Sequence, residues 1–147
     1  MTPAAPVVGV GGVVVREGRV LLIRRGKEPL YGRWVVPGGT VELGETLQQA
    51  LVREMREETD LEVEPLEVLS VFDRIERKDG RVVYHYVIVD YLCRSPSGEA
   101  RAASDALDVA WVAPADFPAY DLPAKALEVI EAAFRRVEGD PCLPSRP

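Results

Sequence analysis

The chain has 147 residues and a formal net charge of -6, with 47% hydrophobic and 29% charged residues. This size and composition are typical of one soluble globular domain and exclude a disordered chain. The negative charge disfavours non-specific binding to nucleic acid or to an anionic membrane, because both need a positive field. The two cysteines, Cys93 and Cys142, lack a CxxC spacing, which argues against zinc or a disulfide framework and favours a reducing cytoplasm.

No segment is expected to cross a membrane or to act as a signal peptide. The longest apolar run, residues 7–15, is far shorter than the ~20 apolar residues that a spanning helix needs. The stretch MTPAAP places no basic side chain ahead of that run, unlike a signal peptide. We therefore expect a cytoplasmic protein.

The chain opens with two predicted strands, residues 7–15 (VVGVGGVVV) and 20–25 (VLLIRR), on either side of the turn sequence REGR. The glycines of the first strand do not fit a dinucleotide-binding loop, because Val14 takes the sixth position of GxGxxG and no helix follows. Close packing of backbone within a sheet is the better explanation of these glycines.

Further elements follow a polar loop and the Pro-Gly-Gly break at residues 37–39. The pattern predicts a helix over about 45–59, strands over 61–72, 82–94 and 109–113, and a closing amphipathic helix over 123–137. An Asp-Gly turn joins the first two of these strands. Together the elements predict an α/β domain, residues 7–137, with a mixed sheet and helices packed on its faces, between tails 1–6 and 138–147.

The first predicted helix carries three glutamates on the face that should meet the sheet. At about 100° per residue, Leu47 and Leu51 share an arc with Glu54, Glu57 and Glu58. Like charges on this face repel one another and lose solvent, so they oppose stability unless a cation binds. Hard oxygen ligands on a partly open face suit Mg²⁺, with Mn²⁺ as a substitute.

The helix alone leaves another interpretation open. An exposed helix with Glu–Arg pairs has a similar composition, and Arg53 can reach Glu57 at the i, i+4 spacing. The residues ahead of the helix decide between the two. From Gly39 to Leu61 the chain resembles the Nudix box, Gx5Ex7REUxEExGU, in which U is a bulky apolar residue. Every fixed position matches except Asp60, which stands where the family has glycine.

The resemblance to the Nudix family extends over residues 7–137 and implies a Nudix-type α/β/α sandwich with a mixed β-sheet. It also implies Mg²⁺-dependent hydrolysis of the pyrophosphate linkage in a nucleoside diphosphate linked to a group X, by attack of metal-activated water. Asp60 follows the helix and should need a left-handed backbone, which Asp enters more readily than most residues.

The resemblance also assigns roles within the box. The implied metal ligands are the carboxylates of Glu54, Glu57 and Glu58 and the backbone carbonyl of Gly38. Glu54 is the candidate general base, Arg53 would orient the carboxylates, and Glu45 would be a stabilising acid nearby.

Outside the box, family members often add a late acidic residue ahead of the last strand. Asp105 is the first candidate, as a further metal ligand or as a general base in competition with Glu54, and Asp108 and Glu99 are its rivals. Basic residues that could bind substrate are Arg24, Arg25 and Arg33. Strand alternation sends only one of the adjacent Arg24 and Arg25 inward, and we favour Arg24.

Two substrate classes remain possible. One is ADP-ribose or a nucleotide sugar, and the other is a (d)NTP, as for a MutT-like pyrophosphatase. The ADP-ribose subfamily often has a proline about fifteen residues beyond the box, and FDRIERKDG has none, which argues mildly against it. The alternative to an enzyme is a non-catalytic Nudix domain that binds a nucleotide metabolite as a sensor. The expected binding partner is thus a small molecule. A homodimer is also possible, because homodimers are common in this family.

Overall fold

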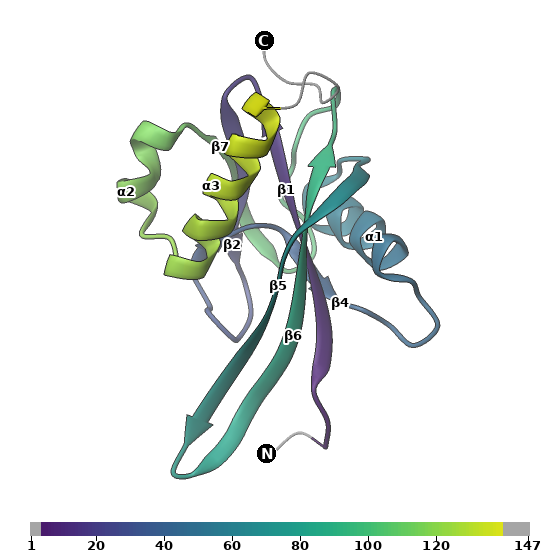
Figure 1. The fold of residues 1–147 in the computed structure, drawn as a ribbon, viewed down its shortest axis with the longest axis vertical. Helices are drawn as coiled ribbons and strands as arrows, with labels where there is room; N and C mark the ends of the chain where they lie inside the picture. The colour runs from purple at the N-terminus through teal and green to yellow at the C-terminus, as the bar shows by residue number, and fades with distance from the viewer. Residues whose placement is uncertain (1–3, 140–147) are drawn as a thin grey trace.

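The computed structural model describes residues 4–139 and forms one mixed sheet with helices on both of its faces (Figure 1). The strands are β1 (Val7–Arg16), β2 (Arg19–Arg25), β3 (Trp34–Val35), β4 (Gly38–Thr40), β5 (Glu64–Lys78), β6 (Arg81–Arg94) and β7 (Ala106–Val112). The helices are α1 (Leu47–Thr59), the short α2 (Phe117–Tyr120) and α3 (Ala124–Gly139), with a 3₁₀ turn η1 (Pro114–Asp116) before α2. The predicted α/β class with a mixed sheet is confirmed.

Strand β1 is the centre of the sheet, whose order is β3-β2-β1-β6-β5. It runs parallel to β6 and antiparallel to β2 and β4. The pairing with β4 uses Gly9 to Gly11, whereas the pairing with β2 uses the far end of β1, at Val15 and Arg16. Strand β4 therefore enters beside the first half of β1 and carries the Gly-Gly pair to the middle of the molecule.

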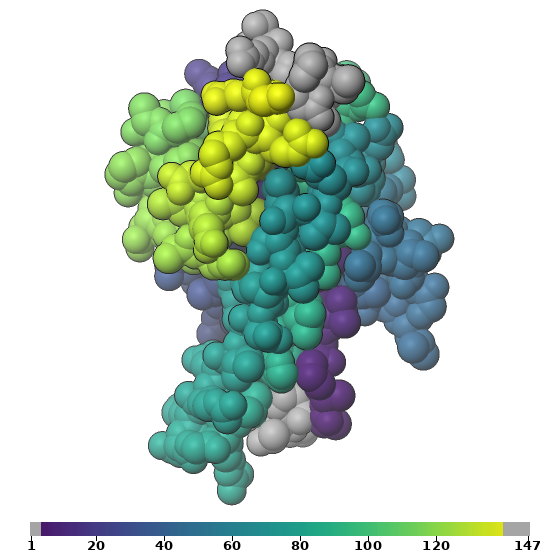
Figure 2. All heavy atoms as spheres, in the orientation of Figure 1, coloured from purple at the N-terminus to yellow at the C-terminus, as the bar shows by residue number. Residues whose placement is uncertain are grey.

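The two faces of the sheet pack against different helices. On one face α1 buries Leu51 and Met55 against Val10 and Val14 of β1. On the other face α3 buries Ile130 together with other apolar residues against β1, β2 and β6. The space-filling view shows α3 lying along the sheet beside β5 (Figure 2). Alternate residues of β1 serve the two cores, as the period of a strand requires.

Helix α1 begins at Leu47, two residues later than predicted. Thr46 is the N-cap: its hydroxyl accepts from the Gln49 backbone N–H, and the Gln49 side chain accepts from the Thr46 N–H. This capping box satisfies two N–H groups that the first turn leaves open. Asp60 ends the helix with φ 61° and ψ 19°, so the predicted left-handed backbone at this position is confirmed.

Several other boundaries differ from the sequence prediction. The short strands β3 and β4 and the short helix α2 were not predicted, because two to four residues carry too little periodicity. Strands β5 and β6 form a longer hairpin than expected, whose tip projects from the body of the molecule (Figure 1). Helix α3 continues past 137 to Gly139; tail residues 1–3 and 140–147, including Cys142, lie outside the described residues. Within 4–139, no helix is long and apolar enough to cross a membrane.

Candidate active site

A cavity of about 240 Å³ lies against the middle of the sheet. Its wall includes the first half of β1, the Gly-Gly pair of β4, the glutamates of α1 and the loop that follows β2. Side chains of β5 and β6 and one residue of α3 form the rest of the wall. Strands and helices far apart in the sequence thus contribute to the wall of one cavity.

Glu58 is held at this cavity by the backbone of β4. Its side chain leaves α1 toward the sheet, the residue is only 4% exposed, and Oε1 accepts a 2.9 Å hydrogen bond from the Gly38 N–H. Burial raises the pKa of Glu58 to about 7; the Gly38 N–H opposes this shift, and the nearby Glu54 charge adds to it. A cation beside Glu58 would favour its ionised form.

Glu54 lies one turn earlier on α1 and also lines the cavity. Its carboxylate packs over Gly39, where a side chain on β4 would overlap the Glu54 carboxyl group. Burial raises the pKa of Glu54, and the hydrogen bond from Arg53 opposes that shift. Gly39 is therefore required because only a residue without Cβ lets the carboxylate approach the strand.

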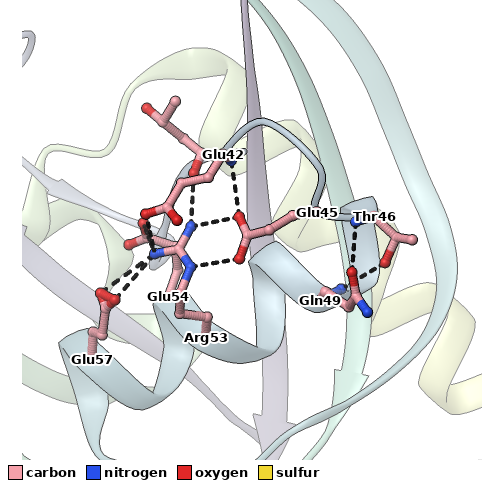
Figure 3. Close-up of polar contacts among 8 residues, drawn as sticks. Glu42, Glu45, Thr46, Gln49, Arg53, Glu54 and Glu57 are labelled. Atoms are coloured by element: carbon pink, nitrogen blue, oxygen red, sulfur yellow. Dashed lines mark hydrogen bonds and ion pairs between the residues drawn. The ribbon is translucent and has the colours of Figure 1, made fainter.

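Arg53 gathers the carboxylates around it (Figure 3). It donates from Nε and Nη2 to Glu45 at 2.7 and 2.9 Å, and from Nη1 to Glu54 at 2.8 Å and Glu57 at 3.1 Å. Nη2 also donates to the Thr40 carbonyl at 3.0 Å. This network lowers the pKa of Glu45 to about 2, chiefly through the Arg53 hydrogen bond. Arg53 thus holds the Glu54 carboxylate and also joins α1 to β4 through Thr40.

Glu57 does not join Glu54 and Glu58 in the cavity. Its side chain is 43% exposed and faces the Arg53 guanidinium. Within 4–139, no group of three or more carboxylate, histidine or cysteine side chains stands ready to hold a metal ion. The shared helix face predicted for the three glutamates therefore brings two of them together in the cavity, and leaves the third on its rim.

Arg25, and not the favoured Arg24, reaches the cavity. Alternation along β2 puts Arg25 on the same face as Leu21, which packs in the core beside α1, and Arg25 lines the cavity. Arg24 instead donates to the Gly32 carbonyl at 3.0 Å. Arg33 donates to the Asp121 carbonyl and is not part of the cavity wall. Lys27, which the sequence analysis missed, lines the cavity from the loop after β2.

Among the late acidic residues, Asp105 is the one that pairs with a cation of the cavity wall, Lys27. Its Oδ2 is 3.0 Å from Nζ of Lys27, and its negative charge contributes to the raised pKa of Glu58. Asp108 accepts from the backbone N–H of Val109, and Glu99 is an exposed side chain 3.7 Å from Arg101. Asp105 does not itself line the cavity.

The sequence analysis missed the cavity wall that β5 and β6 supply. Phe72, Arg74, Tyr86, Ile88 and Asp90 line it. The cross-strand pairs Phe72–Ile88 and Arg74–Tyr86 place these side chains on one face of the hairpin. The alternation of this face could have been found in the sequence, but its closeness to Gly9 and Gly11 depends on the pairing of β6 with β1.

Two known proteins are similar to this chain in sequence. A curated ADP-ribose pyrophosphatase from Methanocaldococcus jannaschii is 37% identical over 102 residues, which is 69% of this chain and 58% of the relative. A MutT-like protein from Streptomyces ambofaciens is 33% identical over 132 residues, covering 89% of this chain and 79% of the relative. The chain thus spans little more than half of the archaeal relative.

A solved structure gives the same result for the fold. The crystal structure of a MutT NUDIX hydrolase from Burkholderia pseudomallei superposes with a TM-score of 0.76 at 35% identity, covering 87% of this chain and 98% of that chain. A family model described as the NUDIX domain matches residues 5–133. With the box glutamates of α1 facing the Gly-Gly pair of β4, the chain belongs to the NUDIX family.

Proposed function

We propose that this chain is a Mg²⁺-dependent pyrophosphohydrolase that cleaves the pyrophosphate linkage of a nucleoside diphosphate linked to a group X. One observation carries the proposal: Glu54 and Glu58 share a cavity with the cations Arg25 and Lys27. Desolvated carboxylates are suited to bind a metal cation, and the basic side chains beside them are suited to bind phosphate groups. Together they fit a metal complex of a phosphorylated ligand.

The donor set fits a divalent cation with a preference for oxygen. Glu54 and Glu58 both have a raised pKa, so a positive charge between them would relieve the cost of their burial. The Gly38 carbonyl and the Glu57 carboxylate complete the proposed ligand set for Mg²⁺, for which Mn²⁺ can substitute. When bound, the ion supplies charge neutralisation of the diphosphate and acidification of water.

The side chains of this protein supply the other functions. Arg25 and Lys27 bind phosphate oxygens by charge. Glu54 takes a proton from the water that attacks phosphorus, and the bond from phosphorus to the bridging oxygen breaks. Arg53 holds Glu54 through the 2.8 Å hydrogen bond, and Glu45 fixes Arg53. Asp105 is the competing general base, since Lys27 connects it to the cavity wall.

Both substrate classes have support from the relatives. One relative is named an ADP-ribose pyrophosphatase and another a MutT-like protein. A panel of ADP-ribose, nucleotide sugars, dinucleoside polyphosphates and canonical or oxidised (d)NTPs, each with Mg²⁺ and with EDTA, decides between them. Pyrophosphate release from a (d)NTP indicates a MutT-like enzyme, and AMP with ribose 5-phosphate indicates an ADP-ribose hydrolase.

Glu54→Gln tests the catalytic assignment. We expect the rate to fall by about 10²-fold or more, as for loss of a general base. Glu62→Gln is the matched control, because Glu62 is exposed and pairs with Arg56 at the other end of α1. An unchanged rate in Glu54→Gln would move the general base to Asp105, and Asp105→Asn checks that outcome.

A ligand-sensing domain is the second candidate. The observation that favours it is the rim position of Glu57, which leaves two carboxylates in the cavity in place of three. Tight metal-free binding of one compound, with no product formed from any compound of the panel, would support sensing and contradict hydrolysis.

We also propose a cytoplasmic location and keep a homodimer as a candidate assembly. Cys93 is a buried free thiol, in keeping with a reducing compartment. Strand β5 is an edge of the sheet, and Val71 and Ile75 on it are 60% and 43% exposed. Light scattering after gel filtration measures the assembly; Val71→Lys would dissociate a dimer formed through this edge.

A further inference from the structure

Asp90 is a buried carboxylate with no assigned role. It lies on β6, is 4% exposed, and lines the cavity. Among residues 4–139 it has no hydrogen-bond or ion-pair partner for its side chain. A buried carboxylate ordinarily has several such partners, because desolvation of an unpaired charge is costly. Asp90 therefore has free acceptor capacity inside the cavity.

Gly11 of β1 lets the Asp90 carboxylate lie against the sheet. In the parallel pairing of β1 and β6, Gly11 lies opposite Asp90 and Gly9 lies opposite Ile88. A Cβ at Gly11 would overlap Oδ1 of Asp90. The Asp90 carboxylate therefore fills the space beside the Gly11 backbone, which only a residue without Cβ allows.

Arg74 complements Asp90 on the same face of the hairpin. It is half-buried in the cavity wall, and within the described part of the chain its guanidinium makes no hydrogen bond or ion pair. Its Cζ lies 6.0 Å from the ring centroid of Phe72, and Nζ of Lys125 lies 4.9 Å from the same ring. The wall therefore contains a hydrogen-bond acceptor, Asp90, and a hydrogen-bond donor, Arg74. Cation–π attraction holds positive charges beside the third side chain, the ring of Phe72.

Two positive charges lie near the buried Asp90 carboxylate and favour its ionised form, which accepts hydrogen bonds. Burial raises its pKa to about 6, while the positive charges of Arg74 and Lys125 oppose that shift. Asp90 and Arg74 are not in direct contact, since no ion pair joins them. A ligand edge with donors beside an acceptor could bridge the two side chains.

We infer that Asp90 and Arg74 read the nucleobase of the substrate and select a guanine-type edge. Guanine presents N1–H and the 2-amino group as adjacent donors, which match the two oxygens of Asp90, and O6 as an acceptor for Arg74. Adenine offers a single amino group beside ring nitrogen and has no keto oxygen. Phe72 and Ile88 add apolar surface to the same wall of the cavity, which a purine ring can contact. This inference rests on the proposed function, because it takes the ligand to be a nucleotide.

The test is equilibrium binding to the metal-free full chain at pH 7.5, measured by calorimetry with GMP, IMP and AMP. These nucleotides share the phosphate and the ribose, and IMP lacks only the 2-amino group of GMP. We expect GMP to bind most tightly. Asp90→Asn should weaken GMP binding roughly 10- to 100-fold, the loss expected for hydrogen bonds to a charged group, and should change AMP binding by less than about threefold.

Matched variants separate base reading from a structural role. Asp73→Asn changes the same residue type on the opposite face of the hairpin, where Asp73 is 65% exposed, and should leave every affinity unchanged. Asp90→Asn should melt at or above the wild-type temperature, because it removes a desolvated charge. Arg74→Gln should weaken GMP and IMP equally, since both carry O6.

Several results would overturn the inference. They are equal binding of GMP and AMP to the wild type, equal binding of GMP and IMP, an Asp90→Asn variant with unchanged selectivity, and no measurable GMP binding at millimolar concentration. Loss of the Asp90→Asn effect with 2′,3′-dideoxy-GMP would assign Asp90 to the ribose and would also contradict base reading. Binding needs no turnover, so a failure of hydrolysis with intact GMP selectivity would refute only the proposed function.

Discussion

Arg53 and Glu45 form a two-point ion pair, with Nε–Oε2 at 2.7 Å and Nη2–Oε1 at 2.9 Å. The pair joins α1 to the loop ahead of it, because Glu45 stands before the N-cap Thr46. It also holds Arg53 in the one orientation from which Nη1 reaches Glu54. Glu45 thus acts on the cavity through Arg53.

Arg53→Lys should reduce activity more than stability. A lysine keeps the charge but cannot pair with both oxygens of Glu45 and still reach Glu54. We expect kcat to fall roughly 10- to 100-fold, as for a misplaced catalytic group, with a small change in Tm. Arg56→Lys is the control, since Arg56 pairs with exposed Glu62. Equal activity of Arg53→Lys and the wild type would contradict the positioning role.

The two glycines of β4 should respond differently to alanine. At Gly38 the new methyl group would meet the carbonyl of Val10, which is backbone and cannot move aside. At Gly39 it would meet the side chain of Glu54, which can rotate away. We expect Gly38→Ala to destabilise the fold by about 2 kcal/mol or more and Gly39→Ala to remove activity while the fold persists.

Denaturant unfolding and a hydrolysis assay check both glycine variants. Gly139→Ala is the control, because a Cβ at the end of α3 meets nothing within 4 Å. A Gly39→Ala enzyme with full activity would show that Glu54 need not lie over the strand.

The stability of the metal-free protein should fall as the pH rises from about 4.5 to about 7. Burial raises the pKa of Glu58 from 4.5 to about 7, so in this window the folded state binds more protons than the unfolded chain, and the free energy of unfolding decreases with pH. The shift corresponds to roughly 3 kcal/mol. Asp90, whose pKa is raised to about 6, contributes in the same direction.

Unfolding in EDTA at pH 5 and pH 8, with Glu58→Gln alongside, isolates the contribution of Glu58. The variant should lose less stability between the two pH values than the wild type. Mg²⁺ should raise the wild-type Tm more at pH 8, where the carboxylates are ionised. Parallel pH curves for the wild type and Glu58→Gln would contradict this account.

Asp60→Gly should stabilise the protein. Asp60 has φ 61°, a left-handed conformation in which Cβ is strained. Glycine removes that strain at a slight entropic cost, and we expect a gain of up to about 1 kcal/mol in chemical denaturation. Asp60→Val should be less stable than the wild type, because branching at Cβ worsens the strain. A valine variant as stable as the glycine variant would contradict the conformational explanation.

The sequence alone predicted the sheet class, the long elements and the box. The i, i+3, i+4 spacing placed Glu54 and Glu58 on the sheet-facing side of α1, where both now line the cavity. The same spacing placed Glu57 on that side, yet the Glu57 carboxylate accepts from Arg53 and lies at the rim of the cavity. Spacing fixes the direction in which a side chain leaves the helix, but neighbouring charges decide where its end group settles.

The choice between Arg24 and Arg25 needed the tertiary structure. Alternation along a strand predicted only that one of the two side chains points inward, and the cavity wall contains Arg25 in place of the favoured Arg24. Which face of β2 meets α1 depends on how the sheet packs against the helices, and the strand pattern alone does not specify it. Lys27 reaches the cavity from a loop, where periodicity gives no direction.

The sequence by itself predicted the family, the direction in which Glu54 and Glu58 leave α1 and the left-handed turn at Asp60. These depend on local spacing and on backbone conformations that few residues adopt. Only the tertiary structure brought Asp90, Arg74 and Phe72 to the same cavity as Glu54. The physical reason is that the Asp-Gly turn predicts the β5–β6 hairpin, whereas the pairing of β6 with β1 joins residues far apart in sequence and no local pattern specifies it.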